Sequence, residues 1–296
     1  METLSRTASV PIMENATEAH VEIEGINYYT LLERPSTGSA GEDAPCILLI
    51  HALMSNHHMW DAAVKALNNA GYRTLRYDHV GHHNTPPPHD THRSYHMDDL
   101  TRHAHHLVKE RIGHSHLHAV VGCSIGGVLA LRFAMMFPDD VERVISIAAP
   151  GLTSSEEAKS LWTDRIQQFE DDQKSGSDTL CHATVNRWFP GERPEDDDVR
   201  AETLHHVKTC SLQGYKVLAD TIRSYDYTSE INNFPQSTQC LILAGNEDSA
   251  ASPDMLREIA GKIHGADFMV LKAGHLPPMH RREQFNDLML RVAKAA

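Results

Sequence analysis

The residue with the clearest chemical setting is Ser124, in the sequence Gly-Cys-Ser-Ile-Gly-Gly at 122–127. An apolar run at 116–121 precedes it, and the spacing of apolar residues at 128–137 predicts a helix after it. A strand, a sharp turn and a helix in this order hold a serine in a strained turn with its hydroxyl exposed. The alternative is a chance Gly-x-Ser-x-Gly sequence that forms only a tight turn. Because the strand and the helix patterns are both present, the sequence favours a nucleophilic serine.

Two residues that could activate this serine follow late strands. Asp248 lies on a turn after the apolar run 239–244, and His275 follows the apolar run 267–271. The carboxyl ends of parallel strands meet at one edge of a sheet, where both residues would reach Ser124. There, neutral His275 would take the Ser124 proton as the oxygen attacks a carbonyl carbon, and Asp248 would hold the imidazole in the required tautomer.

Each of these three roles has an alternative. Glu247 is the competing acid, although the usual turn directs it elsewhere, and Cys123 is the competing nucleophile. Cys123 ends an apolar strand run, where a thiol acts as a small hydrophobic group. The alternative for His275 is a loop histidine without a catalytic role.

An oxyanion that forms on the attacked carbonyl needs two N–H donors. Ile125 begins the helix after the serine, where N–H groups are free and the helix dipole is positive. The second donor is expected at Leu53, in the loop His-Ala-Leu-Met after the strand run 46–50. A glycine usually follows the histidine of such a loop, and Ala52 tolerates positive φ less well, so we expect a different loop conformation. The alternative is an ordinary turn at the end of a strand.

These residues need a scaffold of parallel strands, and the order of elements supplies one. Strand and helix patterns alternate between residues 46 and 149, and again from residue 239 onwards. This alternation predicts an α/β fold, with a mostly parallel twisted sheet flanked by helices. Between the two stretches only helical patterns occur. We expect a flexible leader at 1–18, a core domain at 19–151 and 235–296, and a helical cap at 152–234.

The cap is expected to supply residues that bind substrate. Trp162 and Arg165 are three residues apart on an expected helix and share one face, so the guanidinium could bind a carboxylate while the indole covers an apolar part. The alternative is that Trp162 only packs the cap and Arg165 lays its stem along Phe169. Trp188 and Met54 are the other expected substrate contacts.

Composition excludes several classes of partner. The 296 residues carry a formal charge of -13, which argues against nucleic acid and anionic membranes. No apolar run reaches the roughly 18 residues of a membrane span, and the first ten residues lack the apolar core of a signal peptide, so we expect a cytoplasmic protein.

Five cysteines without metal-binding spacing imply no disulfide framework. The acidic runs at 170–172 and 195–198 are expected to be solvated helix ends.

Histidine is unusually abundant, with 22 residues, several of them in clusters. His57 is followed by His58, His82 by His83, and three more lie within 103–106. No His-Glu-x-x-His sequence and no cysteine pairing connects them. The sequence therefore predicts neither a metal site nor another cofactor.

Several motifs together resemble one family. They are His-Met-Trp-Asp at 58–61, Leu-Arg-Tyr-Asp at 75–78, the sequence around Ser124, Trp-Thr-Asp-Arg-Ile at 162–166, Arg-Trp-Phe at 187–189 and Asp-Tyr-Thr at 226–228. From about residue 20 the chain resembles the α/β-hydrolase superfamily, and within it the 3-oxoadipate enol-lactone hydrolases. The chain order Ser, Asp, His agrees with that superfamily. Departures are Gly-His-His at 81–83 in place of the usual Gly-His-Gly, a triple proline, and extra acidic residues in the cap.

The resemblance implies hydrolysis of a small-molecule ester or lactone through an acyl-enzyme on Ser124, without a metal or an organic cofactor. A C–C bond hydrolase of the meta-cleavage type would use the same three residues. A ligand-binding receptor on a hydrolase scaffold is the alternative from a different class. A serine nucleophile argues against dehalogenases and epoxide hydrolases, which use aspartate. A homodimer remains open.

Overall fold

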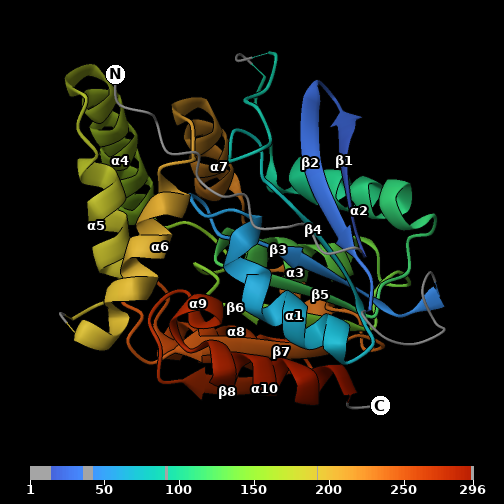
Figure 1. Ribbon diagram of the computed structural model, residues 1–296. Coiled ribbons are helices and arrows are strands. Elements are labelled where there is room, and N and C mark those ends of the chain that lie inside the picture. The colour runs from blue at the N-terminus through green and yellow to red at the C-terminus, as the bar shows by residue number, and fades with distance from the viewer. Residues whose placement is uncertain (1–14, 36–42, 91–92, 192, 295–296) are drawn as a thin grey trace.

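An eight-stranded sheet forms the centre of the molecule in the computed structural model, which describes residues 15–35, 43–90, 93–191 and 193–294 (Figure 1). The strands are β1 (Ala16–Ile23), β2 (Ile26–Glu33), β3 (Cys46–Ile50), β4 (Arg73–Tyr77), β5 (Ala119–Cys123), β6 (Arg143–Ile147), β7 (Gln239–Gly245) and β8 (Asp267–Leu271). Their order across the sheet is β1-β2-β4-β3-β5-β6-β7-β8. β2 pairs antiparallel with β1 and β4, and all other neighbours are parallel. The predicted mostly parallel α/β sheet is confirmed.

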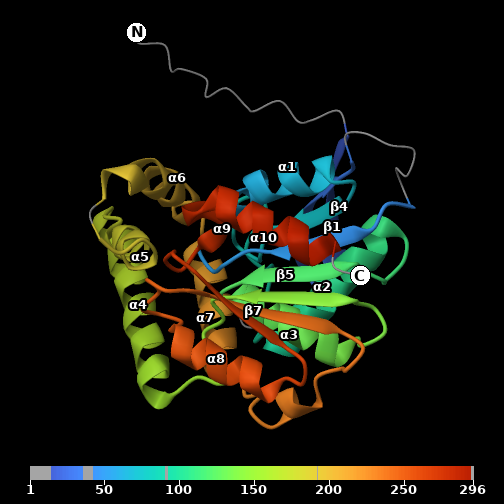
Figure 2. The same ribbon diagram turned by 90° about the horizontal axis from the view of Figure 1, so that it is seen from below.

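Helices cover both faces of this sheet (Figure 2). One face carries α1 (Asp61–Asn69) and α10 (Arg282–Lys294), and the other carries α2 (Met97–Ile112), α3 (Ile125–Met136) and α8 (Pro253–Lys262). Every residue of β3 and β5 is buried, because strands in a sheet covered on both faces have no solvent side. This is why those strands appear in the sequence as continuous apolar runs rather than as alternating ones.

The first hairpin corrects the predicted leader. Residues 1–14 lie outside the described residues, but residues 16–18 belong to β1, where Ala16 pairs with Glu33 and Glu18 pairs with Leu31. The expectation of a flexible leader is therefore wrong for 16–18. All residues of β1 except Ile23 are exposed or half-buried, so this edge strand carries only a weak apolar signal. The chain turns between β1 and β2 at Glu24 and Gly25, both at positive φ.

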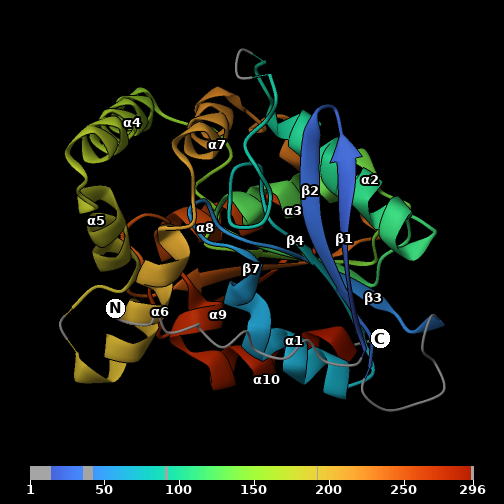
Figure 3. The same ribbon diagram turned by 45° about the horizontal axis from the view of Figure 1, so that its top comes forward.

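Between β6 and β7 the chain forms a helical insertion. Its helices are α4 (Glu156–Ser175), α5 (Thr179–Trp188), α6 (Asp197–Val207) and α7 (Leu212–Ser224). They lie together beyond one end of the sheet (Figures 1 and 3). Shorter helical turns are η2 (His57–Trp60), η3 (Pro194–Asp196), η4 (Glu230–Asn233) and α9 (Pro277–His280). The remaining links are loops, and several of them carry the residues considered below.

One aspartate in each acidic run is buried, contrary to the expectation of solvated helix ends. Asp172 accepts the Leu180 N–H at 2.7 Å, and Asp196 accepts bonds from Arg193 at 2.7 Å and Arg281 at 3.1 Å. Buried carboxylates require donors or cations around them. The acidic runs alone do not show that other segments of the chain supply such donors.

Two further observations concern the chain as a whole. All five cysteines are buried free thiols. No helix within the described ranges combines the length and the apolar character that crossing a membrane requires.

Candidate active site

Ser124 lies at the turn between β5 and α3 with φ 59° and ψ -121°. A non-glycine residue at positive φ costs roughly 1–3 kcal/mol, so the surrounding structure must impose this conformation. Gly122 and Gly126 allow neighbouring backbone segments to approach the turn closely enough to impose it. A Cβ on Gly122 would lie 1.8 Å from the carbonyl oxygen of Gly126, and a Cβ on Gly126 would lie 2.3 Å from that of Ile50. The turn therefore tolerates no side chain at either glycine.

His275 and Asp248 come together from the loops that follow β8 and β7. His275 Nδ1 lies 2.7 Å from Asp248 Oδ2. The other carboxylate oxygen accepts the N–H groups of Ala250 at 2.8 Å and Ala251 at 3.2 Å. Burial acts to raise the pKa of Asp248, but the charge and hydrogen bond of His275 outweigh it and leave the pKa below its usual value. Asp248 is thus held as a carboxylate that accepts from His275.

The competing acid and the competing nucleophile are placed elsewhere. Glu247 forms a two-point ion pair with Arg193, at 2.7 and 3.0 Å. Cys123 is fully buried, and burial raises the pKa of its thiol well above the ordinary value. Neither side chain lines the cavity that Ser124 faces.

That cavity has a volume of about 270 Å³ and lies between the sheet and the helical insertion. Seven residues that the sequence assigns to the site line it: Ser124, His275, Leu53, Met54, Trp162, Arg165 and Trp188. Asp248 and Ile125 are buried behind this lining, at 4% and 0% exposure. The structure therefore brings into one place residues that are up to 222 positions apart, from Leu53 to His275.

The loop after β3 carries Leu53, the expected second oxyanion donor. Positive φ occurs at Met54 (67°) rather than at Ala52. The Met54 N–H donates to His82 Nε2 at 3.0 Å. In the part of the chain that the structure describes, the Leu53 N–H meets no acceptor. Ile125 is the first residue of α3, so its N–H has no acceptor within the helix.

Residues 45–281 match the alpha/beta hydrolase fold family. The chain belongs to this family. It is 24% identical over 245 residues to 3-oxoadipate enol-lactonase 1 of Acinetobacter baylyi, which covers 82% of this chain and 86% of that protein. The crystal structure of the enol-lactonase from Burkholderia xenovorans is similar in fold, with a TM-score of 0.81 and 24% identity, covering 94% of this chain and 100% of that one. A thermophilic esterase from Thermogutta terrifontis matches with a TM-score of 0.79 and 19% identity, covering 94% and 100%.

In this α/β hydrolase, buried histidines hold the loop that carries Leu53. The His79 N–H donates to His51 Nε2, and His79 Nε2 donates to the His51 carbonyl oxygen, both at 2.9 Å. Burial lowers the pKa of His79 to about 3 and that of His82 to about 4, so both rings are neutral at pH 7. The sequence did not assign these histidines a role. The sequence marked them only by their position after a buried strand.

Two arginines of the helical insertion line the cavity of this α/β hydrolase. Arg165 places its guanidinium carbon 4.9 Å from the ring centre of Trp162, while Phe169 packs edge-on against Tyr215. Arg187, which the sequence singled out only as part of a family motif, lines the same cavity. Among residues 15–35, 43–90, 93–191 and 193–294, no carboxylate forms an ion pair with either arginine.

The electrostatics of this arginine pair are unusual for an acidic protein. Burial, and then the positive charge of Arg165, lower the pKa of Arg187 to about 10. Burial also lowers the pKa of Arg165. Both arginines remain charged at pH 7, and two partly buried cations that form no ion pair within the described residues favour an anionic ligand, although the carboxylate of Asp248 acts on Arg187 from a distance.

Proposed function

We propose that this α/β hydrolase cleaves a small ester or lactone through an acyl-enzyme on Ser124. The observation that carries the proposal is that Ser124 and His275 line one cavity while Asp248 holds Nδ1 of His275. With the proton on Nδ1, the Nε2 lone pair is available to take a proton from the Ser124 hydroxyl. The three side chains then form the arrangement that converts a weak alcohol nucleophile into a reactive one.

The proposed reaction has two halves. Ser124 Oγ attacks the carbonyl carbon and its proton passes to His275, while the N–H groups of Leu53 and Ile125 stabilise the oxyanion. His275 returns this proton to the leaving oxygen as the carbon–oxygen bond breaks. In the second half, His275 takes a proton from a water molecule that attacks the acyl-enzyme, and Ser124 leaves with that proton. With a lactone substrate, the leaving oxygen remains on the acyl chain, so one ring-opened acid is the product.

The helical insertion has the position of a cap over this site. We propose a core domain at 16–151 and 235–296, which includes all of β1, and a cap at 152–234, which supplies Trp162, Arg165, Arg187 and Trp188 to the cavity wall. A closed wall excludes water and strengthens the electrostatic interactions inside it. A volume of about 270 Å³ lies just below the usual range for ligand pockets, about 300–1,000 Å³. This size favours a compact substrate.

The chemical class of the substrate follows from the arginines. Arg165 and Arg187 offer two positive charges and the Trp162 ring offers an apolar surface, which together suit a small molecule with a carboxylate. The enol-lactonase names of the two relatives agree with a lactone of this kind. We therefore propose a carboxylated lactone or ester as the substrate.

The test is covalent labelling combined with substitution of Ser124. A fluorophosphonate probe is expected to modify wild type at Ser124, and Ser124→Ala is expected to remove both labelling and turnover of a lactone panel. The lost hydroxyl fills no core volume, so circular dichroism should remain unchanged. Cys123→Ala, which changes the buried residue next to Ser124, should still be labelled at Ser124. Retention of more than about 1% of wild-type turnover by Ser124→Ala would place the nucleophile elsewhere. Turnover of a diketone panel without turnover of lactones would instead indicate the C–C bond hydrolase.

A further inference from the structure

Three histidines that the proposed reaction does not use converge in the core, where His57 is buried and His58 and His83 are half-buried. His57 and His58 belong to η2, directly after the loop that follows β3, and His83 lies in the loop after β4. One ring nitrogen of each lies within 4.8 Å of those of the other two. The ring centres of His57 and His58 are 4.1 Å apart, and each is 5.4 Å from that of His83. None of the three lines the cavity around Ser124.

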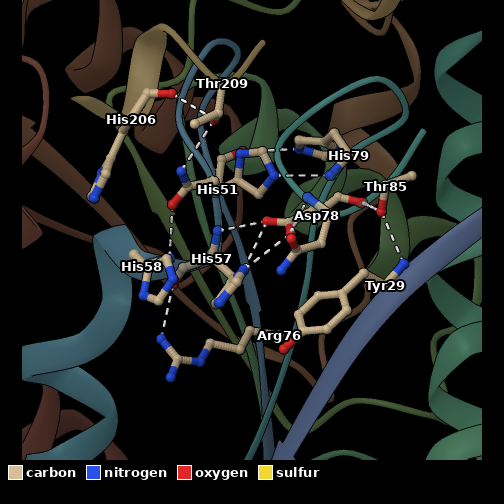
Figure 4. A network of polar contacts seen from close by, with 12 residues as sticks. Tyr29, His51, His57, His58, Arg76, Asp78, His79, Thr85, His206 and Thr209 are labelled. Atoms are coloured by element: carbon tan, nitrogen blue, oxygen red, sulfur yellow. Dashed lines mark hydrogen bonds and ion pairs between the residues drawn. The ribbon is translucent and has the colours of Figure 1, made fainter. Parts of the chain in front are cut away.

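Two of these histidines are oriented by carboxylates. His57 Nδ1 lies 2.9 and 3.0 Å from the two oxygens of buried Asp78, as Figure 4 shows, and His58 Nδ1 lies 3.0 Å from Asp61 Oδ2. A carboxylate on Nδ1 fixes the tautomer and leaves the Nε2 lone pair free. This carboxylate–imidazole arrangement typically surrounds metal ions, because it orients the ring and raises the basicity of its second nitrogen.

A fourth histidine comes from the helical insertion. His206, on α6, packs its ring beside that of His58, with the ring centres 6.1 Å apart (Figure 4). It is only 5% exposed, and its Nδ1 is buried without a hydrogen-bond partner. Buried polar nitrogens almost always have a partner, so an orphaned one is an independent indication of a ligand at this place. The His83 N–H donates to the carbonyl oxygen of Thr209 at 3.1 Å, so this loop already contacts the end of α6.

We propose that His57, His58 and His83 bind one divalent transition-metal ion of the Zn²⁺ type, with His206 as the fourth ligand. Imidazole nitrogens suit Zn²⁺, Ni²⁺ and Cu²⁺, whereas Mg²⁺ and Ca²⁺ prefer oxygen ligands. Nitrogens on a tetrahedral Zn²⁺ lie about 3.4 Å apart, given Zn–N distances of about 2.0–2.1 Å. The nitrogens of His57, His58 and His83 lie within 4.8 Å of one another and would reach this spacing by rotation of the rings. His206 lies outside this group, with its ring centre 6.1 Å from that of His58, and would have to turn toward it when the ion binds.

The proposed ion has a positioning role and does not touch the substrate. Its ligands come from η2 and the loop after β4 in the core, and from α6, so the ion joins the helical insertion to the core. His82, next to His83 in the chain, accepts the N–H of Met54 in the loop that carries Leu53. An ion on His83 would thereby restrict the motion of that loop. Four protein ligands make a closed site, as in structural rather than catalytic zinc centres.

The test is metal binding by full-length protein purified without a polyhistidine tag and stripped with EDTA. Titration with ZnCl₂ is expected to show one tight site per chain, with Kd about 1 µM or lower. Co²⁺ is expected to give the intense visible absorption of tetrahedral coordination. His58→Gln and His83→Gln should each weaken Zn²⁺ binding at least about 100-fold, since each removes one ligand. His114→Gln, at an exposed position outside the cluster, should bind like wild type.

A second variant covers the case in which loss of a histidine disturbs folding. Asp61→Asn keeps every imidazole and changes the exposed partner of His58, and it should weaken binding about tenfold. Asp61 also pairs with Arg76, which keeps its second carboxylate partner, Glu33, in this variant. Circular dichroism of each variant, recorded without metal, separates loss of a ligand from loss of fold. The proposal is overturned if wild type binds Zn²⁺ no more tightly than His58→Gln and His83→Gln, or if Co²⁺ gives only the weak octahedral spectrum.

Discussion

His275 is held from two sides, by Asp248 of the core and by Trp188 of the helical insertion. Asp248 Oδ2 lies 2.7 Å from His275 Nδ1. Trp188 stacks on the imidazole at a ring-centre distance of 5.9 Å. The backbone carbonyl oxygen of Trp188 also accepts a hydrogen bond from the backbone N–H of His275 at 2.9 Å. The ring that we propose as the general base therefore has its tautomer and its orientation set by residues on different elements. Substitution of Asp248 is therefore expected to affect the tautomer and charge of the base, and substitution of Trp188 its orientation.

Asp248→Asn is expected to lower kcat about 10³–10⁴-fold while leaving the protein folded. The amide has the shape of the carboxylate, but it neither carries the negative charge that stabilises the imidazolium nor enforces the Nδ1–H tautomer. Steady-state kinetics on a lactone and urea unfolding measure the two effects. Glu247→Gln is the matched control, because it changes the adjacent acid, which pairs with Arg193. It should keep kcat within about twofold. The opposite ranking of the two variants would assign the catalytic acid to Glu247.

Arg165→Met is expected to lower kcat/KM for a carboxylated lactone at least about tenfold, or about 1.4 kcal/mol. Methionine keeps the apolar stem against Trp162 and removes the charge, so a neutral lactone of similar size should be almost unaffected. Arg223→Met is the control, since Arg223 lies on α7 of the same insertion but does not line the cavity. Equal losses on the charged and the neutral lactone would show that Arg165 holds the insertion together and does not recognise the carboxylate.

The buried histidines are expected to make the protein less stable as the pH falls below 6.5. Burial lowers the pKa of His79 to about 3, whereas an unfolded histidine has a pKa of about 6.5. The stability that neutral His79 contributes is complete above pH 6.5, and it is lost between pH 6.5 and 3 because only the unfolded chain takes up the proton there. Between pH 7.5 and 5.5 this group alone should lower the free energy of unfolding by about 1.4 kcal/mol.

His79→Gln tests this assignment, because the glutamine amide can still donate to the His51 carbonyl oxygen but does not titrate. Urea unfolding at pH 7.5 and 5.5 should show a pH effect smaller by about 1.4 kcal/mol than in wild type. His114→Gln, at an exposed position, should keep the full wild-type effect. An unchanged pH effect in His79→Gln would contradict the role given to this ring.

The sequence by itself determined the features that depend on short segments. The strand, turn and helix around Ser124 are read from neighbouring residues, because apolar periodicity and glycine spacing act within one or two turns of the chain. Asp248 and His275 were predicted from a rule of topology, since parallel strands bring their carboxyl ends to one edge. The structure places both beside each other at that edge, 2.7 Å apart. Their catalytic roles remain a proposal.

Only the tertiary structure decided which distant side chains share a space. Arg187 carries no local sign that it faces the cavity, and nothing in the sequence spacing of His58, His83 and His206 predicts that their rings cluster. The sequence had predicted no metal site, because sequence motifs detect ligands close together in the chain. Burial of Asp172 and neutralisation of His79 likewise depend on neighbours from other elements. The reason is physical: local patterns fix which elements form, whereas cavities, pKa values and ligand clusters arise from the packing of elements against one another.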